Sequence, residues 1–116
     1  MANQGGGRIL TLLSVLGLLP ARSEPLASAM HAALAATIRV HAMKLAPRRV
    51  LVNGLAIGAV GATQPYLVSH VPMSRRGRVE EVAAAAMFLV DPQNTYTVGH
   101  ILNVDGGWQA GFARDF

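Results

Sequence analysis

Hydrophobic residues along the chain form three short continuous runs, separated by longer stretches of mixed character. The runs occupy residues 9–15, 50–57 and 100–104, and glycines follow each of them closely. Apolar runs of about four to eight residues between turn signals are typical of strands buried on both faces of a parallel sheet. The pattern therefore predicts three buried strands.

Two of the mixed stretches predict helices. Apolar side chains in residues 26–45 recur on one helical stripe, and Pro47 ends the helix. The stripe comprises Met30, Leu34, Ile38, Ala42 and Leu45. Residues 80–90 predict a second helix, because Glu80 and Glu81 lie in its first turn, where the helix dipole favours acidic side chains.

The order strand, helix, strand, helix, strand predicts an α/β fold. Right-handed crossovers would join the strands into a three-strand parallel sheet with flanking helices. Residues 62–77 carry two prolines and predict a loop with at most one short turn of helix. A length of 116 residues predicts one domain, spanning 1–116.

The composition narrows the classes of function. Charged residues make up 14% of the chain, against about 25% in an average soluble domain, so we expect some apolar surface to meet a partner. The chain has no cysteine, which excludes disulfides, Cys-ligated zinc and thiol nucleophiles. The four histidines show no paired ligand spacing, so no metal site is expected. The net charge of +4 comes with arginine clusters that lack interleaved aromatic residues, so we expect no nucleic-acid binding.

The first thirty residues allow a second interpretation, as an export signal. Arg8 precedes the apolar residues 9–19, and Ala27-Ser28-Ala29 has the form of a cleavage site. The same residues fit a buried strand that begins after the turn Gly5-Gly6-Gly7. We favour the strand and a cytoplasmic location. The run is shorter than the ~20 residues of a membrane-spanning helix, so no membrane span is expected.

Five motifs, in order and over nearly the whole chain, resemble the C-terminal half of short-chain dehydrogenases/reductases (SDRs). The likeness is greatest to 3-oxoacyl-acyl-carrier-protein reductase-like members. The motifs are Gly6-Gly7-Arg8-Ile9-Leu10-Thr11-Leu12-Leu13-Ser14-Val15-Leu16-Gly17, Leu45-Ala46-Pro47-Arg48-Arg49-Val50-Leu51-Val52-Asn53, Ile57-Gly58-Ala59-Val60, Arg78-Val79-Glu80-Glu81-Val82-Ala83 and Gly99-His100-Ile101-Leu102-Asn103-Val104-Asp105-Gly106-Gly107-Trp108. The resemblance implies a partial Rossmann-like fold whose strands match the family's last three, in a truncated domain without the N-terminal dinucleotide-binding half.

The resemblance also assigns positions to the family's active site. The family's catalytic Ser matches Ser14, whereas its Tyr-x-x-x-Lys falls on Ala27 and His31, so no phenol remains there. Remnants of the nicotinamide-side contacts would be Gly58, Val60 and Thr63.

No NAD or NADP is expected on the isolated chain, and either would be held only by a partner subunit. The turn Gly5-Gly6-Gly7 precedes a strand instead of opening a helix, which is the wrong geometry for a phosphate loop.

Three functions stay open. The first is a degenerate subunit without hydride transfer of its own that supports a full-length SDR. Family members assemble through the helix and strand surfaces that match residues 26–45 and 80–104, so we expect a homo-oligomer or a hetero-oligomer with such a member. Because the strand over residues 9–14 would form an unprotected sheet edge, the chain alone should be oligomeric or insoluble.

The second function is a cofactor-independent isomerase, dehydratase or cyclase. In this enzyme His31 would act as general acid or base, and Ser14 would donate to an oxyanion. Against it, His31 can simply be a polar residue at a half-exposed helix position, and Ser14 a retained strand-end serine. The third possibility is a gene fragment without function.

Overall fold

The sheet is built around one central strand. In the computed structural model, which describes residues 1–61 and 65–111, β2 (Val50–Ile57) pairs in parallel with β1 (Gly7–Ser14) on one side and with β3 (Ile101–Val104) on the other. The register places Leu12 opposite Leu55, and Leu55 opposite Leu102. The predicted α/β fold with a three-strand parallel sheet is confirmed, and the strand bounds lie within one residue or two of those expected.

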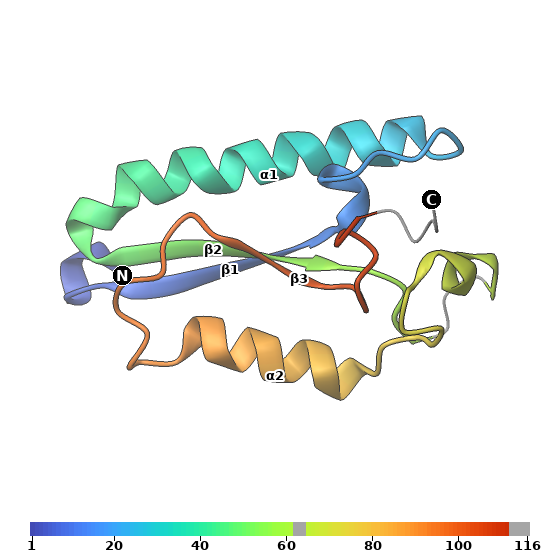
Figure 1. Ribbon diagram of the computed structural model, residues 1–116. Helices are drawn as coiled ribbons and strands as arrows, with labels where there is room; N and C mark the ends of the chain where they lie inside the picture. Colours follow the sequence, from blue (N-terminus) through green and yellow to red (C-terminus); the bar gives the residue numbers. More distant parts are fainter. Residues whose placement is uncertain (62–64, 112–116) are drawn as a thin grey trace.

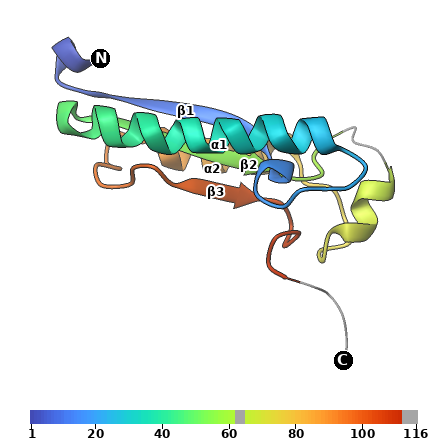
Figure 2. The ribbon, with the colours of Figure 1, turned by 90° about the horizontal axis from the view of Figure 1, so that it is seen from above.

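Two helices cover opposite faces of this sheet (Figure 1). Helix α1 (Pro25–Leu45) lies along β1 and β2, and helix α2 (Val79–Val90) lies against the other face. Seen from above, β1 and β3 form the two edges of the sheet, with β2 between them (Figure 2). Pro25 suits the first turn of α1 because its missing N–H would have no partner within the helix.

Short 3-10 helices occupy several connections. They are η1 (Ala2–Gln4), η2 (Val15–Gly17), η3 (Ala46–Arg48) and η4 (Pro65–His70). The last of these is the short helix expected in the loop of residues 62–77. The end of that loop returns to the sheet, where Val60 and Gly77 form an isolated parallel bridge.

Small side chains on α1 set how closely it packs on the sheet. The α1 residues that are buried are Ser28, Ala35, Ile38 and Ala42. Met30, predicted to lie on the core stripe, is 63% exposed, so that part of the prediction is wrong. The helix is rotated because its small residues allow a closer approach than a stripe with Met30 would. The approach also needs Gly54, since a Cβ there would lie 2.9 Å from Ile38 Cδ1.

The buried side-chain amide of Asn53 connects β2 by hydrogen bonds to the turn before β3. Asn53, on β2, is 1% exposed. Its Nδ2 donates to the carbonyl oxygen of Thr97 at 2.9 Å, and its Oδ1 accepts the backbone N–H of His100 at 3.0 Å. The one side chain therefore holds both ends of the turn that leads into β3, the shortest strand.

We predict that Asn53→Leu lowers the free energy of unfolding by about 1–3 kcal/mol, because the His100 N–H loses its partner in a dry environment. Asn53→Asp should also be destabilising, since it keeps the acceptor but turns a buried oxygen toward the Thr97 carbonyl. Urea denaturation at one fixed chain concentration measures both. The exposed Asn103→Leu on β3 is the control and should change the free energy by less than about 0.5 kcal/mol. An unchanged midpoint for Asn53→Leu would contradict the role of the amide.

Candidate functional site

The residues that could take part in binding or catalysis lie at the carboxyl ends of the strands. Ser14 is the last residue of β1, Gly58 follows β2 and Asp105 follows β3, all at the same end of the sheet. Ligands of open parallel sheets bind at this end. The candidate site therefore lies here, next to the first turns of α1 (Figure 1).

Ser14 and His31 are in contact, but the contact is made by the backbone of Ser14 and not by its hydroxyl group. The backbone N–H of Ser14 donates to His31 Nδ1 at 3.2 Å. An Nδ1 that accepts a hydrogen bond carries no proton, so Nε2 is the ring nitrogen that can donate. The Ser14 hydroxyl oxygen instead accepts the N–H of Leu16 at 3.2 Å and caps η2.

A glycine makes this meeting of β1 and α1 feasible. Gly17 ends η2 directly against α1, and a Cβ at this position would lie 2.6 Å from the carbonyl carbon and oxygen of His31. Only a residue without a side chain lets η2 turn the chain so tightly over the helix. The close approach then holds His31 beside the end of β1.

Ala27 lies one helical turn before His31, on the same side of α1. Its methyl group can neither donate nor accept a proton. The adjacent Ser28 is buried, and its hydroxyl donates to the Glu24 carbonyl at 2.7 Å and accepts the Ala21 N–H at 3.2 Å. Ser28 therefore stabilises the start of α1. Tyr96 is 97% exposed in the turn before β3, at the opposite end of the sheet from Ser14.

The positions matched to nicotinamide contacts have structural roles at the ends of the strands. A Cβ on Gly58 would lie 2.8 Å from the Asp105 Cα, so Gly58 allows the chain to pass close to the end of β3. The Gly58 N–H also donates to the Val104 carbonyl at 3.0 Å. Val60 forms the bridge with Gly77. Thr63 lies outside the described residues.

The glycines near the N-terminus do not fit a dinucleotide pyrophosphate. The Gly6 N–H donates to the Met1 carbonyl at 3.1 Å, and the Gly7 N–H donates to the Arg49 carbonyl at 3.1 Å. Their donors are therefore occupied, and β1 follows them where a phosphate loop would open a helix.

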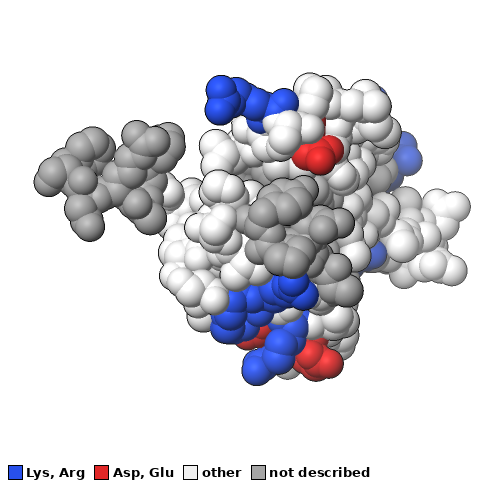
Figure 3. All heavy atoms as spheres, turned by 90° about the vertical axis from the view of Figure 1, so that its right-hand side faces the viewer, with Lys and Arg blue, Asp and Glu red and all other residues white. Residues whose placement is uncertain are grey.

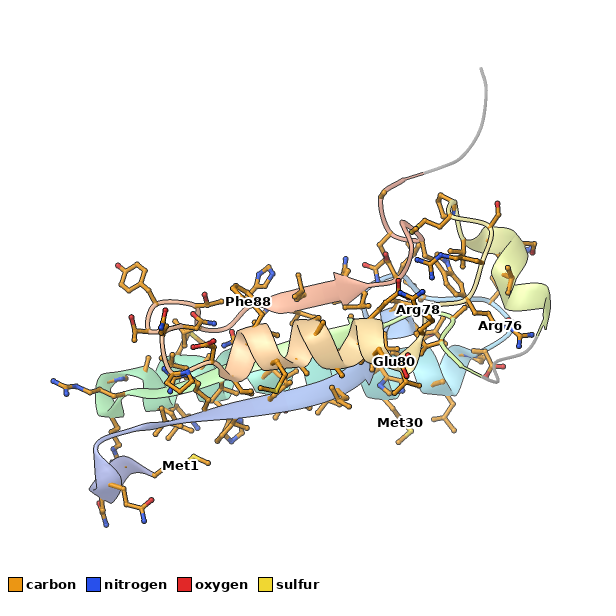
Figure 4. All side chains as sticks on the ribbon, turned by 90° about the horizontal axis from the view of Figure 1, so that it is seen from below. Met1, Met30, Arg76, Arg78, Glu80 and Phe88 are labelled. Carbon is orange, nitrogen blue, oxygen red and sulfur yellow. The ribbon has the colours of Figure 1, made fainter. Side chains whose placement is uncertain are left out.

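A hollow of about 500 Å³ opens between the ends of β2 and β3 and the start of α2. Its charged lining consists of Asp105 and an ion pair, in which Arg75 contacts Glu81 Oε1 at 2.8 Å and Oε2 at 2.9 Å. Arginine and glutamate side chains gather over this end of α2 (Figure 3), where Arg78 and Glu80 lie close together (Figure 4). Arg75 and Glu81 neutralise each other, whereas the Asp105 carboxylate is held by backbone N–H groups.

The Arg75 hydrogen bond lowers the pKa of Glu81 from 4.5 to about 2, and the N–H of Arg78, which donates at 2.8 Å, adds to this effect. The same bond raises the pKa of Arg75. The sequence predicted Glu81 at the start of a helix, but six residues separate it from Arg75, and no local signal pairs them.

Asp105 organises the turn after β3. Its carboxylate accepts the N–H groups of Gly107 and Gln109, each at 2.9 Å. Gln109 Nε2 then donates to the Val15 carbonyl at 3.1 Å, which ties the turn to the end of β1. Asp followed by two glycines is a turn signal, but the reach of Gln109 across the site has no sequence signature. The rings of His70 and Trp108 stack nearby, with centroids 6.0 Å apart.

Residues 1–61 and 65–111 contain no group of three or more His, Cys, Asp or Glu side chains that could hold a metal ion. Among the same residues, no helix has the length and hydropathy required to cross a bilayer.

Comparison with known proteins identifies relatives over nearly the whole chain. A family model described as enoyl-(acyl carrier protein) reductase matches residues 1–109. A 3-oxoacyl-[acyl-carrier-protein] reductase from Synechocystis sp. is 35% identical, over 92% of this chain and 46% of its own length. The human protein of the same name is 33% identical, over 94% of this chain and 48% of its own. The chain thus spans about half the length of the curated relatives it matches.

Solved structures agree on the fold. The acetoin dehydrogenase YohF from Salmonella typhimurium superposes with a TM-score of 0.86 at 33% identity, over 97% of this chain and 47% of its own. The NADP-bound protein ElxO gives a TM-score of 0.89 at 23% identity, over 96% of this chain and 50% of its own, a likeness of fold alone.

The lowered pKa of Glu81 predicts a pH dependence of stability. A carboxylate whose pKa is depressed by folding stabilises the native state fully above its unfolded value, 4.5, and loses that contribution as the pH falls through about 2. Thermal unfolding should therefore show a fall in midpoint between these values, which Glu81→Gln flattens. Glu80→Gln, one residue away, is the control and should keep the slope. A carboxyl NMR titration of Glu81 near pH 4.5 would contradict the ion pair.

Proposed function

The chain belongs to the short-chain dehydrogenase/reductase family, and on that basis we propose that it is a subunit that carries out no hydride transfer itself and supports a full-length member of the family. NAD or NADP, when present, would be bound by that partner. The observation that carries the proposal is the state of the two positions matched to the family's Tyr and Lys. One holds a methyl group, and the other holds an imidazole whose Nδ1 is bonded to the backbone.

The chemistry of these two positions supports the absence of hydride transfer. Ala27 has no proton to give to a carbonyl oxygen. The His31 Nδ1 lone pair is used by the Ser14 N–H, which leaves only the Nε2–H to face a ligand. The occupied N–H groups of Gly6 and Gly7 support a lack of pyrophosphate binding as well.

The apolar surface of the two helices supports assembly. Exposed apolar side chains lie on α1, where Leu26 is 72% exposed and Met43 is similarly open, and on α2, where Met87 and Phe88 are exposed. Both helices would therefore bury apolar surface against a partner.

A cytoplasmic location is part of this proposal. The apolar run that has the form of an export signal begins in β1, which pairs with β2 along its whole length. Leu13 and Val15, in and after this strand, belong to the buried core. A segment that the core requires is a poor candidate for removal by a signal peptidase.

The second candidate function, a cofactor-independent isomerase, dehydratase or cyclase, has one observation in its favour. The structure brings His31 to the end of β1, next to Ser14. The Nε2–H of His31 and the Ser14 hydroxyl would be its working groups. The Ser14 oxygen is already an acceptor for the Leu16 N–H, which suits a structural role at least as well.

The subunit role predicts a stable complex when the chain is co-expressed with a tagged full-length SDR of the same organism. Replacing Leu26 and Met30 on α1 by Glu should abolish co-purification, because it places charge on the surface that the partner would bury. Tyr96→Ser, on an exposed turn at the end of the sheet, is the control and should leave the complex intact. Isothermal titration should find NADP(H) binding in the complex and none in the chain alone.

Two results would contradict this role. A dissociation constant in the low micromolar range for the chain alone, about −8 kcal/mol, would give the chain a cofactor site of its own. A complex that survives both Glu substitutions would remove α1 from the interface. A chain that enters no complex and is degraded in the cell would favour the gene fragment.

The enzyme alternative predicts a different outcome for His31→Ala and Ser14→Ala. Turnover measured without nicotinamide cofactor, on carbonyl and hydroxy substrates, should disappear in either variant if these residues form a site. His41→Ala, also on α1, is the matched control, since its ring is hydrogen-bonded to the Thr37 carbonyl and not to β1. A subunit without activity should show no turnover in any of these proteins, and an intact complex in all of them.

A further inference from the structure

The carbonyl oxygen of Val15, just after β1, accepts more hydrogen bonds than it has lone pairs. The backbone N–H groups of Leu18 and Leu19 donate to it at 3.0 and 2.9 Å. The side-chain amide of Gln109 also donates to it, with Nε2 at 3.1 Å. Because a carbonyl oxygen has two lone pairs, the two backbone donors are enough to satisfy it. The Gln109 bond is therefore surplus for Val15.

Gln109 belongs to a turn that is held together by its own hydrogen bonds. The Asp105 carboxylate accepts the N–H groups of Gly107 and Gln109, each at 2.9 Å. The Asp105 carbonyl oxygen accepts the N–H of Trp108 at 3.2 Å. Since these bonds lie within residues 105–110, this segment, which we call the strap, can move without losing them.

The strap is fixed to the sheet at its start. Asp105 passes so close to the end of β2 that a Cβ on Gly58 would lie 2.8 Å from the Asp105 Cα, and the Gly58 N–H holds the preceding Val104 carbonyl at 3.0 Å. The next carbonyl, of Gly106, accepts the Met73 N–H at 3.2 Å. A motion of the strap would therefore pivot at its first residues and be largest at its far end.

The middle of the strap is held by contacts of another kind. The Trp108 ring stacks on His70, with centroids 6.0 Å apart, and lies partly buried against the core cluster that includes Val15. Contacts between rings and apolar groups can shift without leaving a polar group unpaired. Moving this part of the strap costs packing energy and no hydrogen bond.

Detaching Gln109 leaves no buried acceptor without a donor. Val15 keeps its two backbone donors, and the freed amide can bond to water. The bonds of Asn53 lack this property, because their loss would leave the His100 N–H unpaired. The bond between Gln109 and Val15 is thus one that the protein can break and remake at low cost.

We propose that the strap is a movable cover at the candidate site and that the Gln109 amide holds it closed. The strap lies at the carboxyl end of the sheet (Figure 1). In the closed position, Gln109 is bonded to Val15, as in the structure. In the open position the amide is free, and the strap swings away from the end of β1 as one unit. Because Val15 directly follows Ser14, this motion changes the access to Ser14 and to His31 beside it.

This inference goes beyond the subunit role and does not depend on it, because neither a partner nor a cofactor enters the argument. The strap would act in the same way beside a working site or beside one that has lost its chemistry. Its test therefore needs the chain alone, and a readout of the position of the strap.

Trp108 provides that readout, because it is the only tryptophan of the chain. Acrylamide quenching of its fluorescence measures how far the strap is open. Gln109→Ala should raise the quenching constant about twofold, because the amide that holds the far end is gone. Gln109→Glu keeps the shape of the side chain and should raise the constant further, since its carboxylate is repelled by the Val15 carbonyl oxygen at neutral pH. Gln93→Ala, in the exposed turn after α2, is the matched control and should leave the constant unchanged.

Nuclear magnetic resonance distinguishes a moving strap from a general loss of stability. In Gln109→Ala, the ring-proton signals of His70 should move toward those of an unstacked histidine, because the indole above it is displaced. The N–H of Gly107, which is bonded inside the strap, should exchange with solvent at its natural rate. The urea midpoint should also stay that of the natural chain, since no acceptor is left unpaired.

Four results would overturn the proposal. Equal quenching constants in the natural chain and both Gln109 variants would show that the amide does not hold the strap. Faster exchange at Gly107 in Gln109→Ala would show that the turn unfolds instead of moving as a unit. A lower urea midpoint with an unchanged His70 spectrum would make the amide an ordinary stabilising contact. A Gln109→Ala chain that fails to fold would show that its bond to Val15 is not surplus.

Discussion

The backbone hydrogen bonds of β2 are the constraint on which the rest of this structure depends. A strand with neighbours on both sides must supply partners to each, and β2 does so with alternate residues, odd-numbered toward β1 and even-numbered toward β3. Both faces of such a strand are covered by helices, which explains why Leu55 and Ala56 are fully buried. The edges of the sheet, the packing of α1 and α2, and the common end where the strands stop all follow from this arrangement.

The same demand for partners shapes the candidate site. At the end of β1 the outward N–H of Ser14 has no strand beside it, and the His31 imidazole on α1 takes it. At the end of β3 the Asp105 carboxylate takes two more N–H groups, and Gln109 carries the connection to Val15. These side chains therefore have their hydrogen-bonding groups occupied by the backbone. Groups used in this way have less freedom to act on a substrate, which is the physical argument for the subunit role that we propose.

Packing density sets a second limit, on where bulky residues can lie. Gly54 under Ile38, Gly17 against His31 and Gly58 beside Asp105 are three points where two backbones or a backbone and a side chain approach too closely for a Cβ. Ala35 and Ala42 have the same effect on α1. Larger apolar residues lie on the outer faces of the helices, where Met30, Met43 and Phe88 are exposed.

Local sequence determined the elements and their order, because apolar run length, proline positions and acidic first turns act within a few residues. The parallel sheet followed from that order, and the match of Ser14, Ala27 and His31 to an active site followed from the family motifs. Tertiary structure alone decided which side of α1 is buried, since Met30 yields to the small residues that fit over Gly54. It also decided what Asn53, His31, Arg75 and Arg8 bond to. Their partners lie between 6 and 86 residues away, and contacts across such separations are set by how the elements pack.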